Sequence, residues 1–69
     1  MSDRIWPGAD GQPISCREKL RTLADNEAEA CQVLQDAFED AILMGVDEQA
    51  VRDAFTAMIA GLRSPKVGV

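Results

Sequence analysis

The sequence contains no histidine and no tyrosine, and its aromatic residues are one tryptophan and two phenylalanines among 69 residues. Histidine is the usual general base at neutral pH and the commonest protein ligand of metal ions. Without histidine, a catalytic site lacks its usual base and a metal site lacks its commonest ligand. Two cysteines without histidine are too few for a structural zinc site. We therefore predict a protein that is not an enzyme and that holds neither a metal nor a cofactor.

Long apolar runs are also missing. The longest uninterrupted run, residues 41–46, is far shorter than the roughly 20 residues that cross a bilayer, so we predict no membrane-spanning segment. The first residues do not join a basic segment to an apolar core, which predicts no secretory signal and a cytoplasmic protein. Alanine is plentiful whereas β-branched residues are few, and this balance favours an all-α fold.

Charge is unevenly distributed along the chain. The net charge is −5, and the segment from Asp25 to Asp53 holds nine acidic residues and a single basic one, Arg52. Negative charge repels phosphate groups, so direct binding to nucleic acid or to an anionic membrane is disfavoured. The acidic segment is either a hydrated outer face or a docking surface for a basic partner. The acidic patch consists of Asp36, Glu39 and Asp40.

Residues 37–51 carry three local signals of a helical hairpin with a short corner at Gly45 and Val46. Gly45 fits the left-handed position just past a helix C-terminus because it has no Cβ. Asp47 can cap a following helix by accepting a hydrogen bond from a free backbone N–H. Val46 and Val51 have the spacing of a hydrophobic staple, in which side chains on either side of the cap pack together.

The first helix of the hairpin is predicted over residues 15–44. Ser15 and Glu18 have the spacing of a capping box, which places the helix start at Ser15. Asn26 and Glu29 match the same pattern, so a break near Asn26 is an alternative to one continuous helix. The apolar positions keep their helical phase across that point, and this favours the continuous helix.

The second helix is predicted over residues 48–62, where apolar residues recur at helical spacing before Pro65. Residues 1–14 indicate an extended tail with turns, because proline and glycine are frequent there. Residues 63–69 are expected to form a frayed tail. The hairpin, residues 15–62, makes up the one domain that a chain of this length can form.

The two predicted helices differ in length. At 1.5 Å per residue the first is about 43 Å long and the second about 22 Å. The second can therefore cover only half of the first, and apolar positions near the start of the first helix stay uncovered. These positions are Leu20, Leu23, Ala24 and Ala28. The N-terminal tail, a second copy or a different protein must cover them, and we predict a four-helix bundle completed by association.

Trp6 and Cys16 each have more than one interpretation, and Cys31 has one. Trp6 stands in a polar tail, which either folds back onto the helices, anchors on another chain or is disordered. Cys16 lies in the first helical turn, where the helix dipole lowers a thiol pKa, so it is either a reactive thiol or an incidental one. Cys31 falls on the apolar stripe and is predicted to be a small buried core residue.

These observations predict a non-enzymatic helical interaction protein, an accessory, assembly or regulatory subunit that binds a larger protein, homodimerises or does both. One alternative is an acidic mimic of nucleic acid that inhibits a basic protein. Another is a thiol sensor built on Cys16. The predicted interface residues are Trp6, Leu20, Leu23, Leu34, Phe38, Phe55 and Met58.

Overall fold

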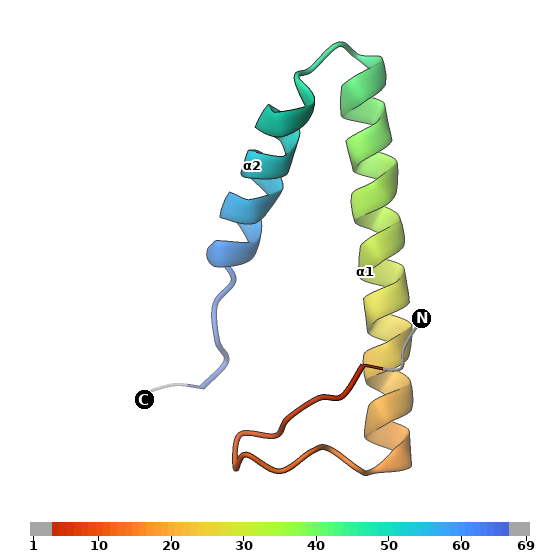
Figure 1. Ribbon diagram of the computed structural model, residues 1–69, viewed down its shortest axis with the longest axis vertical. Coiled ribbons are helices and arrows are strands. Elements are labelled where there is room, and N and C mark those ends of the chain that lie inside the picture. The colour runs from red at the N-terminus through yellow and green to blue at the C-terminus, as the bar shows by residue number, and fades with distance from the viewer. Residues whose placement is uncertain (1–3, 67–69) are drawn as a thin grey trace. The chain divides into compact units, whose positions relative to one another are not determined.

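Two helices joined by a short corner make up the secondary structure of this protein, of which a computed structural model describes residues 4–66. Helix α1 spans Arg17–Leu43 and helix α2 spans Glu48–Ala60 (Figure 1). No strand is present within residues 4–66. The prediction of an all-α helical hairpin is therefore confirmed for that part of the chain.

The chain divides into two compact units, Met1–Gln35 and Asp36–Val69, called here the N-terminal unit and the C-terminal unit. The N-terminal unit contains the leading segment and the first part of α1. The C-terminal unit contains the last turns of α1, the corner and α2.

The corner after α1 has the hydrogen bonds of a Schellman motif. Gly45 has φ +94° and donates its N–H to the carbonyl of Ile42 at 3.0 Å. Val46 donates to the carbonyl of Ala41 at 3.0 Å. These two bonds satisfy carbonyls that a helix end otherwise leaves without a partner. The positive φ explains why the chain uses glycine here, because a Cβ disfavours this conformation.

The start of α2 is capped as the sequence predicts. Asp47 is the N-cap, and its Oδ2 accepts a hydrogen bond from the N–H of Ala50 at 2.9 Å. A cap of this kind stabilises a helix by about 1 kcal/mol. Val51, the second member of the predicted staple, is buried in the first turn of α2. The corner thus combines a stop signal, a start signal and one buried apolar side chain.

The start of α1 differs from the prediction. The helix begins at Arg17, and the first helical hydrogen bond runs from the N–H of Leu20 to the carbonyl of Cys16 at 3.0 Å. Cys16, and not Ser15, is therefore the N-cap. Ser15 precedes the helix because the side chain of Cys16 accepts the N–H groups of Glu18 and Lys19 in the first turn. From Arg17 onwards α1 is continuous, without a break near Asn26.

The end of α2 also comes earlier than predicted, at Ala60 rather than near residue 62. Gly61 is the C-cap and donates its N–H to the carbonyls of Ala57 and Met58 at 3.0 and 3.2 Å. The bond to Met58 spans three residues, which is the tightened last turn common at helix ends. Leu62, which the prediction placed in α2, lies beyond its end.

The segment before α1 forms a hydrogen-bonded loop between Trp6 and Ile14 (Figure 1). Ile14 donates to the carbonyl of Trp6 at 2.7 Å, and Gly8 donates to the carbonyl of Gln12 at 2.6 Å. Inside the loop, Oδ1 of Asp10 accepts the N–H of Gln12 at 3.0 Å. These bonds give the loop a defined form despite its proline and glycine content. Residues 1–3 and 67–69 of the predicted tails lie outside the described residues.

Candidate interaction surface

The C-terminal unit is held together around Val51. Val51 is 5 % exposed and is the only buried residue within residues 4–66. Beside it, the guanidinium of Arg52 lies over the Phe38 ring, with its carbon 4.8 Å from the ring centroid. Arg52 also pairs with Glu48 at 3.1 Å, one helical turn away. Cation–π contacts and ion pairs at exposed sites contribute at most about 1 kcal/mol each, so Val51 dominates the packing of the corner.

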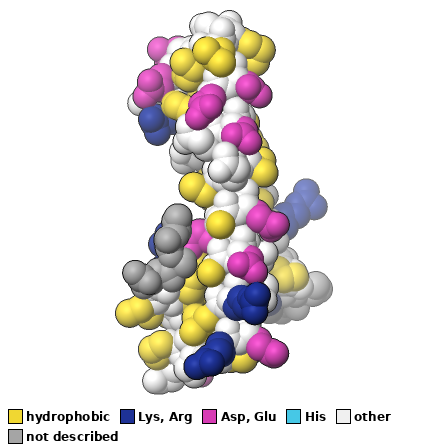
Figure 2. All heavy atoms as spheres, turned by 90° about the vertical axis from the view of Figure 1, so that its right-hand side faces the viewer, with side chains coloured by type: hydrophobic (Ala, Val, Ile, Leu, Met, Phe, Trp, Pro, Cys, Tyr) yellow, Lys and Arg dark blue, Asp and Glu magenta, His cyan; other side chains and the backbone are white. Residues whose placement is uncertain are grey.

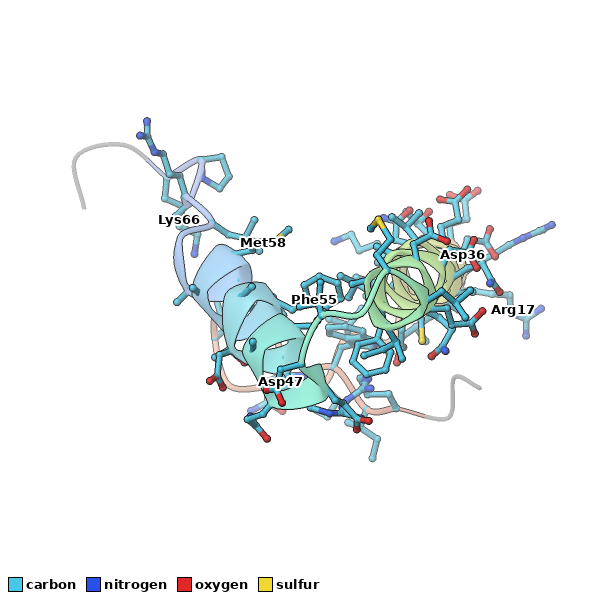
Figure 3. All side chains as sticks on the ribbon, turned by 90° about the horizontal axis from the view of Figure 1, so that it is seen from above. Arg17, Asp36, Asp47, Phe55, Met58 and Lys66 are labelled. Atoms are coloured by element: carbon cyan, nitrogen blue, oxygen red, sulfur yellow. The ribbon has the colours of Figure 1, made fainter. Side chains whose placement is uncertain are left out.

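Along the apolar stripe of α2, cover is lost with distance from the corner. Phe55, one turn after Val51, is half-buried. Met58 is 60 % exposed and Leu62 is 77 % exposed. Phe55 and Met58 project from the same side of α2 (Figure 3). The second half of this stripe is therefore an uncovered apolar surface.

An ion pair ties the leading segment of the N-terminal unit to α1. Arg4 donates from Nη2 and Nε to Oε2 of Glu27, at 2.6 and 3.2 Å. The Glu27 side chain is only 23 % exposed. Arg4 also lies over the Trp6 ring at 5.6 Å, and Trp6 is half-buried. The leading segment thus folds back on its own helix at Glu27, as one of the alternatives for the tail predicts.

A shallow apolar groove lies in the N-terminal unit, where the loop meets the first turns of α1. Its volume is about 370 Å³. Its lining residues are Ile14, Glu18, Lys19, Thr22 and Leu23. The groove shows that the leading segment covers the start of α1 only in part.

All of the predicted interface residues except Met58 have intermediate exposure. In the N-terminal unit these half-buried residues are Trp6, Leu20, Leu23 and Leu34. In the C-terminal unit Phe38 and Phe55 are half-buried and Met58 is exposed. Near the start of α1, Ala24 is half-buried as well, whereas Ala28 is exposed. Leu20, Leu23 and Ala24 thus have partial cover within the chain, whereas Ala28 stays exposed.

Cys31 is exposed, so the prediction that it is a buried core residue is wrong. Its position follows the apolar phase of α1, but helical phase says only which side a residue is on. It does not say what covers that side. Val33, which was not among the predicted interface residues, is 66 % exposed.

The acidic patch, Asp36, Glu39 and Asp40, is exposed in the C-terminal unit. Asp36 projects away from α2 (Figure 3). Acidic side chains repeat along one side of α1, with apolar side chains beside them (Figure 2). α1 is thus amphipathic, with an acidic outer side that favours contact with water.

The exposed thiol of Cys16 lies at the N-terminus of α1. Hydrogen bonds from the backbone N–H groups of Lys19 and Glu18 lower its pKa from the usual value of a cysteine. These donors are free because the first turn of a helix lacks carbonyl partners for them. They stabilise the thiolate more than the thiol.

We expect this arrangement to be visible in the reaction of Cys16 with iodoacetamide, measured across pH in a Cys31→Ala variant. The thiolate is the reacting form, so the rate should rise at a lower pH than for the same chain in urea. In urea the helix and its N–H donors are lost. The same pH profile in the folded and unfolded chain would contradict the role of Cys16 as the N-cap.

Glu27 gives a second expected titration. The hydrogen bond from Arg4 lowers the pKa of the Glu27 carboxyl from its usual value. Because the pKa in the folded chain is below that in the unfolded chain, the pair stabilises the fold above the unfolded value and is lost as pH falls through the folded value. Carbon NMR of the side-chain carboxyl should show the lowered midpoint. Arg4→Gln should move it back towards the usual value, and an unchanged midpoint would argue against the pair.

The Arg4–Glu27 pair is the contact that sequence reasoning missed. Its members are 23 residues apart, and no local spacing rule joins an arginine in a tail to a glutamate in a helix. The one available signal was the interruption of the apolar stripe of α1 by Glu27. A charged residue at such a position often has a partner.

Two further properties bear on the class of site. Within the described part of the chain, no three cysteine, aspartate or glutamate side chains come together in a way that could hold a metal ion. Neither helix, as far as residues 4–66 are concerned, combines the length and apolar content needed to cross a bilayer. The sequence matches no family model, no curated protein and no solved structure.

Proposed function

We propose that this chain is a non-enzymatic helical interaction protein, an accessory, assembly or regulatory subunit. Its uncovered apolar surfaces bind a larger protein, a second copy of the chain or both. Association of this kind completes a four-helix bundle, of which one copy supplies two helices. The proposed partner-facing residues are Trp6, Leu20, Leu23, Leu34, Phe38, Phe55 and Met58.

One observation carries the proposal. Hydrophobic residues make up 46 % of the sequence, yet only Val51 is buried within residues 4–66. The large apolar side chains that are exposed are Ile5, Val33, Leu43, Met44, Val46, Met58, Ile59 and Leu62. Burying a side chain of this size contributes about 1.5–3 kcal/mol, so a partner that covers several of them adds as much stability as a small domain has.

Helix stability gives the same expectation. Isolated helices shorter than about 12–15 residues are marginal in water, and most helical stability in proteins comes from packing. α2 has 13 residues and one buried side chain. The chain alone therefore has little to keep α2 helical, whereas a chain with a partner has the missing contacts.

The test uses the purified full-length chain. We expect weak, poorly cooperative unfolding in urea at low micromolar concentration, with binding of a fluorescent dye specific for exposed apolar surface. Helicity measured by circular dichroism should rise when a partner or a higher concentration of the chain covers that surface. A stable monomer that unfolds cooperatively and binds no dye would overturn the proposal.

A further inference from the structure

The second half of the apolar stripe of α2 is uncovered, and the charges at the two ends of α2 indicate which partner binds there. Met58 and Leu62 provide its apolar part, together with Ile59, which is 58 % exposed. α2 has acidic residues at its start, Asp47 and Glu48, and basic residues after its end. Those basic residues are Arg63 and Lys66, both exposed. Figure 3 shows Asp47 and Lys66 at opposite ends of α2.

We infer that this surface binds a second copy of the same chain, with the two α2 helices antiparallel. This inference rests on the proposed function and names the partner, the surface and the orientation. A surface that is acidic at one end and basic at the other is complementary to itself only when turned end for end. A parallel pair would instead set like charges against each other at both ends.

The register follows from the same residues. When Phe55 lies opposite Met58 of the second copy, Ala54 lies opposite its Ile59. In that register the start of each α2, with Asp47 and Glu48, lies beside the segment that follows the end of the other α2 and carries Arg63 and Lys66. A two-fold axis repeats every one of these contacts, as an isologous dimer requires. The small Ala54 then meets the larger Ile59, so the uncovered side chains of each copy fill the space beside the other.

A different partner protein fits this surface less well. A basic partner would match Asp47 and Glu48 but repel Arg63 and Lys66, and an acidic partner would do the reverse. The other copy satisfies both ends with one orientation. With a second copy of the chain, no other protein is needed to cover this surface.

The apolar contact is tested by the mass of the chain in sedimentation equilibrium, from micromolar to millimolar concentration. The unmodified chain should approach twice its mass of 7.5 kDa. Met58→Ser should raise the dissociation constant at least about tenfold. The matched control is Val33→Ser, because Val33 is 66 % exposed and lies outside α2. Val33→Ser should leave the dissociation constant unchanged.

The orientation is tested by exchanging charges on exposed residues. In an antiparallel pair, R63E/K66E sets acidic residues against acidic ones at both ends, so this variant alone should dissociate. E48K leaves one acidic and one basic residue at the start of α2 and so removes the net attraction there, and it should weaken the pair less. An equimolar mixture of the two should associate more tightly than R63E/K66E alone, since the mixed pair sets opposite charges against each other at one end and has no net repulsion at the other. The control R17E/R21E changes the net charge as much as R63E/K66E does, but at the start of α1, and should associate as the unmodified chain does.

The outcomes separate this inference from the proposed function. A monomer at all concentrations that still binds apolar dye would overturn the α2 pairing and leave a different protein as the partner. A dimer that resists Met58→Ser would overturn it too, because another face would then hold the copies together. R63E/K66E that dimerises as tightly as the unmodified chain would rule out the antiparallel orientation.

Discussion

Replacing Val51 by aspartate is expected to unfold the helical corner and most of α2. Val51 is the only buried side chain within residues 4–66. Its loss removes about 1.5–3 kcal/mol of apolar burial. A carboxylate at the same place has to be taken out of water and adds a penalty of several kcal/mol unless the corner opens to water. The sum exceeds what a single two-helix chain can lose.

The measurement is helicity by far-ultraviolet circular dichroism, together with urea unfolding of the same samples. Val33→Asp is the matched control, because it puts the same residue into the interior of a helix at a site that is 66 % exposed. The control should lose only the few tenths of a kcal/mol that separate the helix propensities of valine and aspartate. Equal losses in the two variants would show that burial of Val51 does not hold the corner.

Replacing Gly45 by L-alanine is expected to cost about 1–2 kcal/mol, the penalty of a left-handed conformation for a residue with a Cβ. The φ of Gly45 is +94°. A Cβ added there would meet no heavy atom within 4 Å, so steric contact with other residues does not contribute. The whole loss of stability therefore comes from the positive φ of the backbone at position 45, and the substitution tests that conformation alone.

A chain of 69 residues can be made by chemical synthesis, so D-alanine can be placed at position 45 as the mirror-image control. D-Alanine prefers positive φ and restricts the unfolded chain more than glycine does, and it should stabilise the corner by about 0.4–1 kcal/mol. The urea midpoint at constant slope gives both values. If the two enantiomers shift the midpoint equally, the Schellman motif is not what ends α1.

The corner could be predicted from the sequence because all its determinants are local. Gly45, Asp47 and the pair of valines lie within seven residues, and each has one strongly preferred role at a helix end. The continuity of α1 past Asn26 was also predictable, since apolar phase is a property of neighbouring turns. The existence and type of both helices follow from such short-range rules.

The start of α1 and the exposure of Cys31 could not be predicted in this way. Ser15 and Cys16 both offer a side-chain acceptor for a first turn, and it is Cys16 that accepts the N–H groups of Glu18 and Lys19. The capping-box spacing favours Ser15 and does not distinguish between two adjacent acceptors. Cys31 has the right phase for a core, yet its exposure depends on which other segment covers that side of α1. The candidate surface on α2 was predicted only through Phe55 and Met58, because the loss of cover along the stripe is a tertiary property.

The fluorescence of Trp6 reports on the N-terminal unit. It is the only tryptophan, and there is no tyrosine, so the ultraviolet emission of the whole chain comes from one indole. That indole is half-buried beneath the guanidinium of Arg4. A red shift of its emission on warming therefore records the leading loop leaving α1, whereas loss of ellipticity records the helices. When the two curves separate, the leading loop leaves α1 in a step apart from the melting of the helices, and no label has to be attached to see it.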